Sequence, residues 1–121
     1  MKKLLLALAL LCAALPSYAA SCRVTEYRSL ASDSNGNWIP VALEPSITSQ
    51  SVTYTTAVAS SAFNSATRFI RVVCTAKAHF KVSVAGTNAT ANDPYMSADA
   101  PEYFGVQPNL SLKINFYDGS S

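Results

Sequence analysis

Apolar and polar residues alternate with a period of two over most of the chain after residue 20. This spacing is typical of β-strands that bury one face, and no stretch of this region shows the apolar stripe of a helix. Clusters of turn-forming residues separate the alternating runs. The pattern predicts strands at 22–30, 38–43, 50–58, 67–75, 78–84, 101–106 and 110–117. The fold class that follows is all-β, an antiparallel β-sandwich or small barrel of about six or seven strands.

Three of these runs indicate which side chains should be buried, because side chains alternate across a strand. In run 67–75 the inward face consists of Ile70, Val72 and Cys74. In run 78–84 the inward face consists of Phe80, Val82 and Val84, which leaves His79 on the polar, solvated face. In the final run Leu110, Leu112, Ile114 and Phe116 alternate with Ser111, Lys113, Asn115 and Tyr117, so the apolar set is expected inward and Asn115 on the opposite face.

The turn signals predict how some of the runs are connected. The dipeptide Asn35-Gly36 is a strong signal for a hairpin turn. The strand expected after it, at 38–43, contains Pro40, which cannot donate to a β-ladder and therefore places this strand at the edge of a sheet. Two other stretches are expected to be loops, 59–66 and 86–94.

The first twenty residues have the layout of a secretory signal peptide. Lys2 and Lys3 precede an apolar run at 4–15, and small residues then offer a cleavage site after Ala19. The apolar run is too short to span a bilayer comfortably. We therefore expect a cleavable N-terminal signal helix at 1–19 and a single β-sandwich domain at 20–121. Export would cross a bacterial inner membrane to the periplasm, cell surface or medium, with membrane contact only through the uncleaved signal segment.

Removal of the leader changes the charge of the protein. The whole chain has a formal net charge of +2, with nine Lys and Arg against seven Asp and Glu. Lys2 and Lys3 account for the surplus, so the mature domain is neutral. Nucleic-acid binding needs clustered positive charge, and the composition gives no reason to expect it.

Cysteine usage fits an exported protein. Cys12 belongs to the leader, which leaves the pair Cys22 and Cys74. In an oxidising compartment this pair is expected to form a disulfide. A bond that closes a loop of about fifty residues contributes about 4 kcal/mol in the chain-entropy model. Two alternatives stay open: two free buried thiols, or lipidation of Cys22 after cleavage at a lipobox-like sequence.

The sequence carries no recognisable catalytic motif. His79 is the only histidine, and no nucleophile motif accompanies it. We therefore expect a protein that is not an enzyme, without catalytic residues, metal ligands or cofactors. One alternative for a metal is a calcium loop that would use Asp93, Asp99 and Glu102.

Aromatic residues offer the only candidate binding residues. Flat rings suit the faces of sugars, and Trp38 and Tyr95 are the candidates for binding a glycan. Packing in the core and protection of sheet edges account for most aromatic residues in β-proteins, and this remains the simpler interpretation.

Three segments resemble a group of small proteins encoded by tailed bacteriophages and prophages. The segments are Thr67–Val72 (TRFIRV), Gly86–Ala91 (GTNATA) and Met96–Phe104 (MSADAPEYF), and the resemblance extends over about residues 57–118. It implies a small β-sandwich in a virion-associated or other structural role, with no catalytic residues to carry over.

The function expected from these features is that of a non-enzymatic, exported structural or interaction protein. The resemblance implies a phage- or prophage-derived module associated with a virion or an envelope. Its partner would be another protein or a second copy of itself. One alternative is a subunit of a fimbria-like surface assembly, in which the alternating final strand would serve β-strand addition. The other alternative is a secreted domain that binds carbohydrate or peptide.

Overall fold

The computed structural model describes residues 19–119, and these residues form ten strands without a helix. The signal helix expected before residue 19 lies outside the described residues. Within the described part of the chain, no helix is long and apolar enough to cross a membrane. The strands are β1 (Ala20–Tyr27), β2 (Leu30–Ser32), β3 (Trp38–Ala42), β4 (Thr48–Tyr54), β5 (Val58–Ala59), β6 (Phe69–Cys74), β7 (Ala78–Ser83), β8 (Tyr95–Met96), β9 (Glu102–Gly105) and β10 (Lys113–Tyr117).

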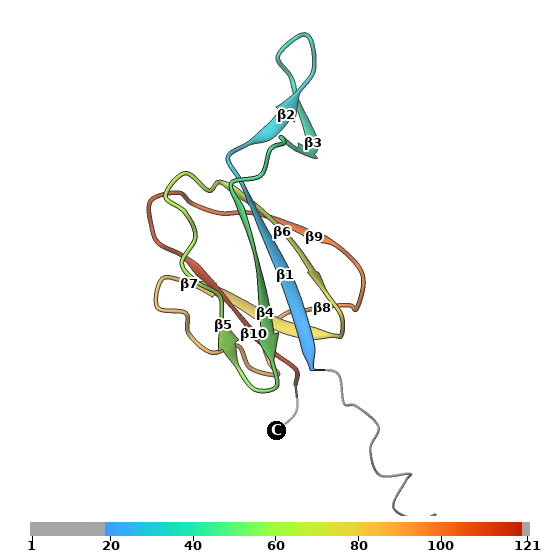
Figure 1. Cartoon of the computed structure of the whole chain (residues 1–121), viewed down its shortest axis with the longest axis vertical. Helices are drawn as coiled ribbons and strands as arrows, with labels where there is room; N and C mark the ends of the chain where they lie inside the picture. The colour runs from blue at the N-terminus through green and yellow to red at the C-terminus, as the bar shows by residue number, and fades with distance from the viewer. Residues whose placement is uncertain (1–18, 120–121) are drawn as a thin grey trace, which may run out of the picture.

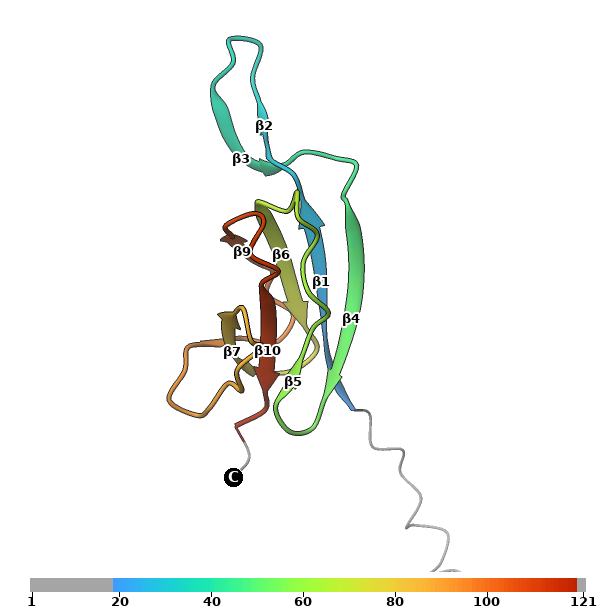
Figure 2. The ribbon, with the colours of Figure 1, turned by 90° about the vertical axis from the view of Figure 1, so that its left-hand side faces the viewer.

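These strands form three antiparallel sheets, which confirms the expected all-β class. Two sheets have four strands each, in the orders β4-β1-β6-β9 and β5-β10-β7-β8. They lie in two layers, which we call the two-sheet body (Figures 1 and 2). The third sheet is the hairpin of β2 and β3, which projects from one end of the body. Both ends of the described chain lie at the opposite end of the body (Figure 1).

One hydrophobic core joins the two layers. Val24 of β1 pairs with Val72 of β6, and both are fully buried. Ile114 and Phe116 of β10 enter the same core from the other sheet, with the Phe116 ring 6.0 Å from that of Tyr54. The inward face expected for run 67–75 is therefore confirmed. In run 110–117 it is confirmed for Ile114 and Phe116, whereas Leu110 lies before the strand and is exposed.

The two cysteines of the domain face each other across neighbouring strands. Cys22 of β1 pairs with Cys74 of β6 in the sheet register, and their sulfur atoms are 2.03 Å apart. Both side chains are buried, and the Met96 sulfur lies 3.3 Å from that of Cys74. The expected disulfide pair is therefore present.

Two expected strands differ from those observed because the chain changes direction within the run. The run 50–58 contains two strands, since the turn at 55–57 carries the chain from β4 in one sheet to β5 in the other. The last strand begins only at Lys113. The backbone before it has left-handed conformations at Asn109 (φ 64°) and Ser111 (φ 52°), which interrupt an extended strand.

The prediction that His79 is solvated was wrong. His79 is only 7% exposed, because the rings of Tyr95 and Tyr117 lie 5.6 and 6.3 Å from its imidazole ring. Its Nδ1 lies 2.9 Å from the carbonyl oxygen of Asp93. The expected inward orientation of Val84 was also wrong, since Val84 follows the end of β7 and is exposed. Asn115, expected on the outer face, is buried on that face by the 86–89 loop.

The run at 38–43 forms a strand in a different place from the one expected. The hairpin turn at Asn35-Gly36 is confirmed, with the Gly36 amide donating to the Asp33 carbonyl at 3.0 Å. However, β3 does not extend either sheet of the body. The first strand ends at Tyr27, and the chain then leaves the body to pair β2 with β3.

Candidate functional site

The projecting hairpin carries four of the eight large apolar side chains that are exposed in the described part of the chain. We call residues 29–43 the arm, since the Leu43 amide closes it by donating to the Ser29 carbonyl at 3.1 Å. Its exposed apolar residues are Trp38 (70% exposed), Val41 (51%), Leu43 (50%) and Ile39. Exposed apolar side chains concentrated in one short segment mark an interaction surface, and this concentration makes the arm the candidate site.

The tip of the arm is a hydrogen-bonded, negatively charged turn. The Asp33 carboxylate accepts hydrogen bonds from the backbone amides of Asn35 and Asn37, both at 2.9 Å. Hydrogen bonds from Asn37 are the main cause that holds the pKa of Asp33 below its ordinary value. Asp33 is therefore ionised at neutral pH, and its charge projects into solvent at the tip.

The arm is anchored to the body by a short network at its base. The Tyr27 hydroxyl donates to the Glu44 carboxylate at 3.1 Å, and the other carboxylate oxygen of Glu44 accepts the Ser46 amide at 2.8 Å. Burial raises the pKa of Tyr27, and the hydrogen bond to Glu44 raises it further. The chain segment that enters the arm and the segment that leaves it are thereby tied together.

A cleft of about 520 Å³ lies where the arm meets the outer face of the β6–β9 strand pair. We call it the arm-base cleft, and its lining residues are Ser29, Leu30, Trp38, Arg68, Phe69 and Gly105. A Cβ atom at Gly105 would meet nothing within 4 Å, so this side of the cleft is open. The Phe69 ring stacks on Tyr103 at 5.5 Å, which extends the apolar floor along β9.

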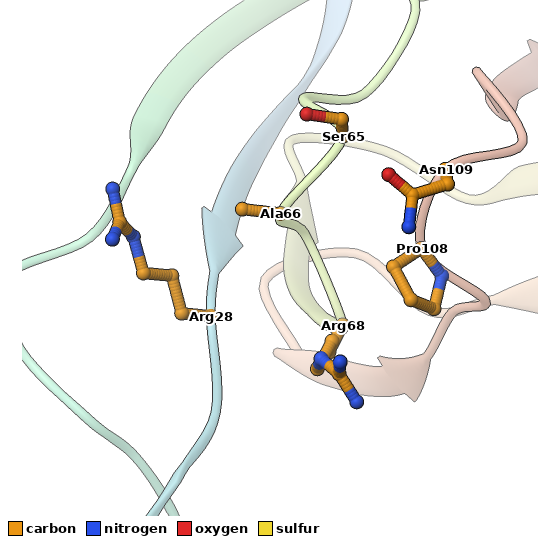
Figure 3. A pocket seen from close by; sticks show the side chains of 6 residues that line it. All are labelled: Arg28, Ser65, Ala66, Arg68, Pro108 and Asn109. Atoms are coloured by element: carbon orange, nitrogen blue, oxygen red, sulfur yellow. The ribbon is translucent and has the colours of Figure 1, made fainter.

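A second cleft of about 390 Å³ lies beside the first, at the same end of the body (Figure 3). Its lining residues are Arg28, Ser65, Ala66, Arg68, Pro108 and Asn109. Figure 3 shows that the guanidinium groups of Arg28 and Arg68 point away from one another. They do not converge on one bound anion, but they give the base of the arm a positive charge.

The two candidate glycan-binding aromatics are not brought together. Trp38 lies on the arm, whereas Tyr95 lies on β8 at the edge of the second sheet (Figure 1). The Lys77 ammonium lies 4.1 Å from the centre of the Tyr95 ring, and the edge of His79 also contacts this ring. The two rings therefore form no common platform for a sugar.

The acidic residues considered for calcium do not gather into a site. Within residues 19–119 no three His, Cys, Asp or Glu side chains lie close enough to hold a metal ion. Asp93 instead accepts hydrogen bonds from the backbone amide and hydroxyl of Thr90, at 2.7 and 3.2 Å. The bond from this amide is the main cause that lowers the pKa of Asp93.

The final strand is already paired on both sides within its own chain. β10 lies between β5 and β7, with five residue pairs to β7. On its other side, the Ser60 amide donates to the Ile114 carbonyl and the Phe63 amide to the Leu112 carbonyl, both at 2.8 Å. Strand addition through β10 would require this pairing to be broken.

Sequence reasoning singled out Trp38 but missed the surface to which it belongs. A signal was present in the stretch WIPVAL at 38–43, which does not alternate apolar with polar residues as a half-buried strand does. Comparison of the chain with models of known families, with curated proteins and with solved structures found no match.

Proposed function

We propose that the chain is an exported, non-enzymatic β-sandwich protein with a structural role, and that the arm is its docking element. The observation that carries this proposal is the cluster of exposed apolar side chains on a hairpin that stands clear of the body. Exposed apolar area of this kind costs solubility unless a partner covers it.

Export is supported by two independent features. The leader pattern at 1–19 predicts secretion, and the Cys22–Cys74 pair is of the kind that persists in oxidising compartments. The Cys22 sulfur is bonded to that of Cys74, so Cys22 has no free thiol that could carry a lipid. This argues for a cleaved, soluble form rather than a lipoprotein anchored at Cys22.

A structural role in a virion or an envelope is supported by the resemblance to small phage and prophage proteins. The resemblance extends over about residues 57–118, which include the strands from β5 to β10. The arm lies outside this range. We infer that the shared segment supplies a framework, and that the arm adapts this framework to a partner of its own.

The proposal can be tested in cells that export the protein. A photo-crosslinking amino acid is placed at position 38 on the arm and, as a control, at position 84 on the body, where Val84 is also strongly exposed (58%, against 70% for Trp38). We expect adducts from position 38 and none from position 84, with the adducted partner identified by mass spectrometry. Equal adducts from both positions, or none from the arm, would refute the arm as a docking element.

Export is tested separately by the intact mass of the recovered protein. We expect a chain that begins at Ala20 and lacks two hydrogens relative to the dithiol form. An uncleaved chain or two reactive thiols would contradict this part of the proposal.

A further inference from the structure

We propose that the arm docks on the arm of a second copy of this chain, in an antiparallel, two-fold symmetric pair. This inference rests on the proposed role of the arm as a docking element and names its partner. In this arrangement the tip of each arm lies against the base of the other. The apolar strands β3 meet in the middle, and each arm also covers the arm-base cleft of the other copy.

The distribution of charge along the arm favours this arrangement. The tip carries the ionised carboxylate of Asp33, whereas the base carries the exposed guanidinium groups of Arg28 and Arg68 beside the single carboxylate of Glu44, so positive charge is in excess at the base. An antiparallel pair places each negative tip beside the positive base of its partner. A parallel pair would instead bring like charges together, which is unfavourable. The surface is thus complementary to itself, as a two-fold interface requires.

The middle of the arm is suited to burial. No charged residue occurs between Asp33 and Glu44, so covering this segment leaves no buried charge unpaired. Trp38 is the most exposed large apolar side chain described, and aromatic side chains of this size are common anchors of interfaces. The apolar floor of the cleft, from Leu30 and Phe69, offers a surface for the partner's apolar residues.

The hairpin itself gives a further reason for a partner. Only two residue pairs register between β2 and β3, Leu30 with Ala42 and Ser32 with Trp38, with an irregularity between them. A two-stranded hairpin alone is marginally stable in water. Packing against a second arm would supply the contacts that this hairpin lacks.

The test uses the purified mature chain, residues 20–121 with its disulfide intact, in sedimentation equilibrium over a range of protein concentrations. We expect a monomer–dimer equilibrium. Val41→Asp on the arm should weaken the dimer by about tenfold or more, because it places a charge in the apolar middle. Val84→Asp is the matched control, since Val84 is similarly exposed but lies on the body. It should leave the dimer unchanged.

A charge-exchange pair tests the antiparallel register. Ser34→Arg at the tip and Arg68→Glu at the base should each weaken the dimer, and the double variant should recover much of the loss. Circular dichroism and the thermal midpoint of each variant establish that the body remains folded. If the double variant loses as much dimer affinity as the two single variants combined, the antiparallel arrangement is overturned.

The outcomes separate this inference from the proposed function. A monomer at all concentrations, or a dimer that Val41→Asp does not weaken, overturns arm-to-arm pairing. If the chain is monomeric while position 38 forms adducts with a different protein in cells, the arm remains a docking element but its partner is not a second copy. A chain that is monomeric and forms no adducts from the arm contradicts both.

Discussion

Thr67 and Glu26, 41 residues apart in the sequence, meet in the interior, where the Thr67 hydroxyl donates to the Glu26 carboxylate at 2.5 Å. Both side chains are only 1% exposed. The same carboxylate oxygen accepts the Asn64 backbone amide at 2.8 Å. A buried carboxylate on β1 therefore holds the irregular segment before β6 in place, close to the base of the arm.

We expect Thr67→Val to lower the free energy of unfolding by about 1–3 kcal/mol, because it removes a hydrogen bond from a buried carboxylate. Thr67→Ser keeps the hydroxyl and serves as the control, with a smaller loss expected. Urea denaturation of the mature chain measures both. Equal losses in the two variants would indicate that packing, and not the hydrogen bond, is what Thr67 contributes.

Removal of the disulfide should destabilise the domain strongly. The bond joins residues 52 positions apart, and the chain-entropy model gives about 4 kcal/mol for a loop of this length. The double variant Cys22→Ala, Cys74→Ala should show this loss in denaturant unfolding. Addition of a reductant to the variant should have no further effect, whereas it should destabilise the wild type. A wild type whose midpoint does not respond to reduction would contradict the prediction.

The anchor of the arm should weaken in alkaline solution. Burial and the Glu44 hydrogen bond raise the pKa of Tyr27 above its ordinary value of 10.0, so the folded state holds this proton more tightly than the unfolded state. The resulting stability is fully present below pH 10.0 and is lost as the pH rises through the folded pKa. Burial also raises the pKa of Tyr54, which contributes in the same direction.

The free energy of unfolding, measured with denaturant at increasing alkaline pH, should therefore fall as the pH rises. The fall per pH unit should be smaller for Tyr27→Phe than for the wild type. Identical slopes for the wild type and Tyr27→Phe would contradict a role for Tyr27.

The buried amide of Asn115 should be important for the loop that covers β10. Its Oδ1 accepts the Ala89 amide at 2.9 Å, and its Nδ2 lies 3.4 Å from the Gly86 carbonyl. Asn115→Leu leaves a buried amide without an acceptor, and we expect a loss of about 1–3 kcal/mol. Hydrogen exchange at Ala89 should accelerate at the same time. Asn92→Ala, at an exposed position, should change stability by less than about 0.5 kcal/mol.

The alternation of residues identified the buried faces well in two strands that have a neighbour on each side, β6 and β10. In β6 and β10 the predicted inward residues are buried because each strand lies inside a sheet and has one face on the core. The same rule failed for Val84 and His79. Val84 lies beyond the end of its strand, and two tyrosine rings from other strands cover His79. The alternation of apolar and polar residues along the chain records neither where a strand ends nor which side chains from other strands cover it.

The candidate site was predictable only in part. Trp38 was named as a possible binding residue, and the turn that leads to it was predicted from Asn35-Gly36. The arm was not predicted, because a short apolar run with a proline is as compatible with the edge of a sheet as with a separate hairpin. The sequence did not indicate that Trp38 and Tyr95, the two aromatic candidates, lie in different sheets.

The sequence by itself determined the strand-forming runs, the hairpin turn and the cysteine pair, since these depend on local periodicity, turn chemistry and the count of cysteines. Only the tertiary structure decided that the chain leaves the body after Tyr27 and that Glu26 becomes a buried anchor. These features depend on which strands become neighbours. Contacts between residues far apart in the chain set that choice, and no local pattern records them.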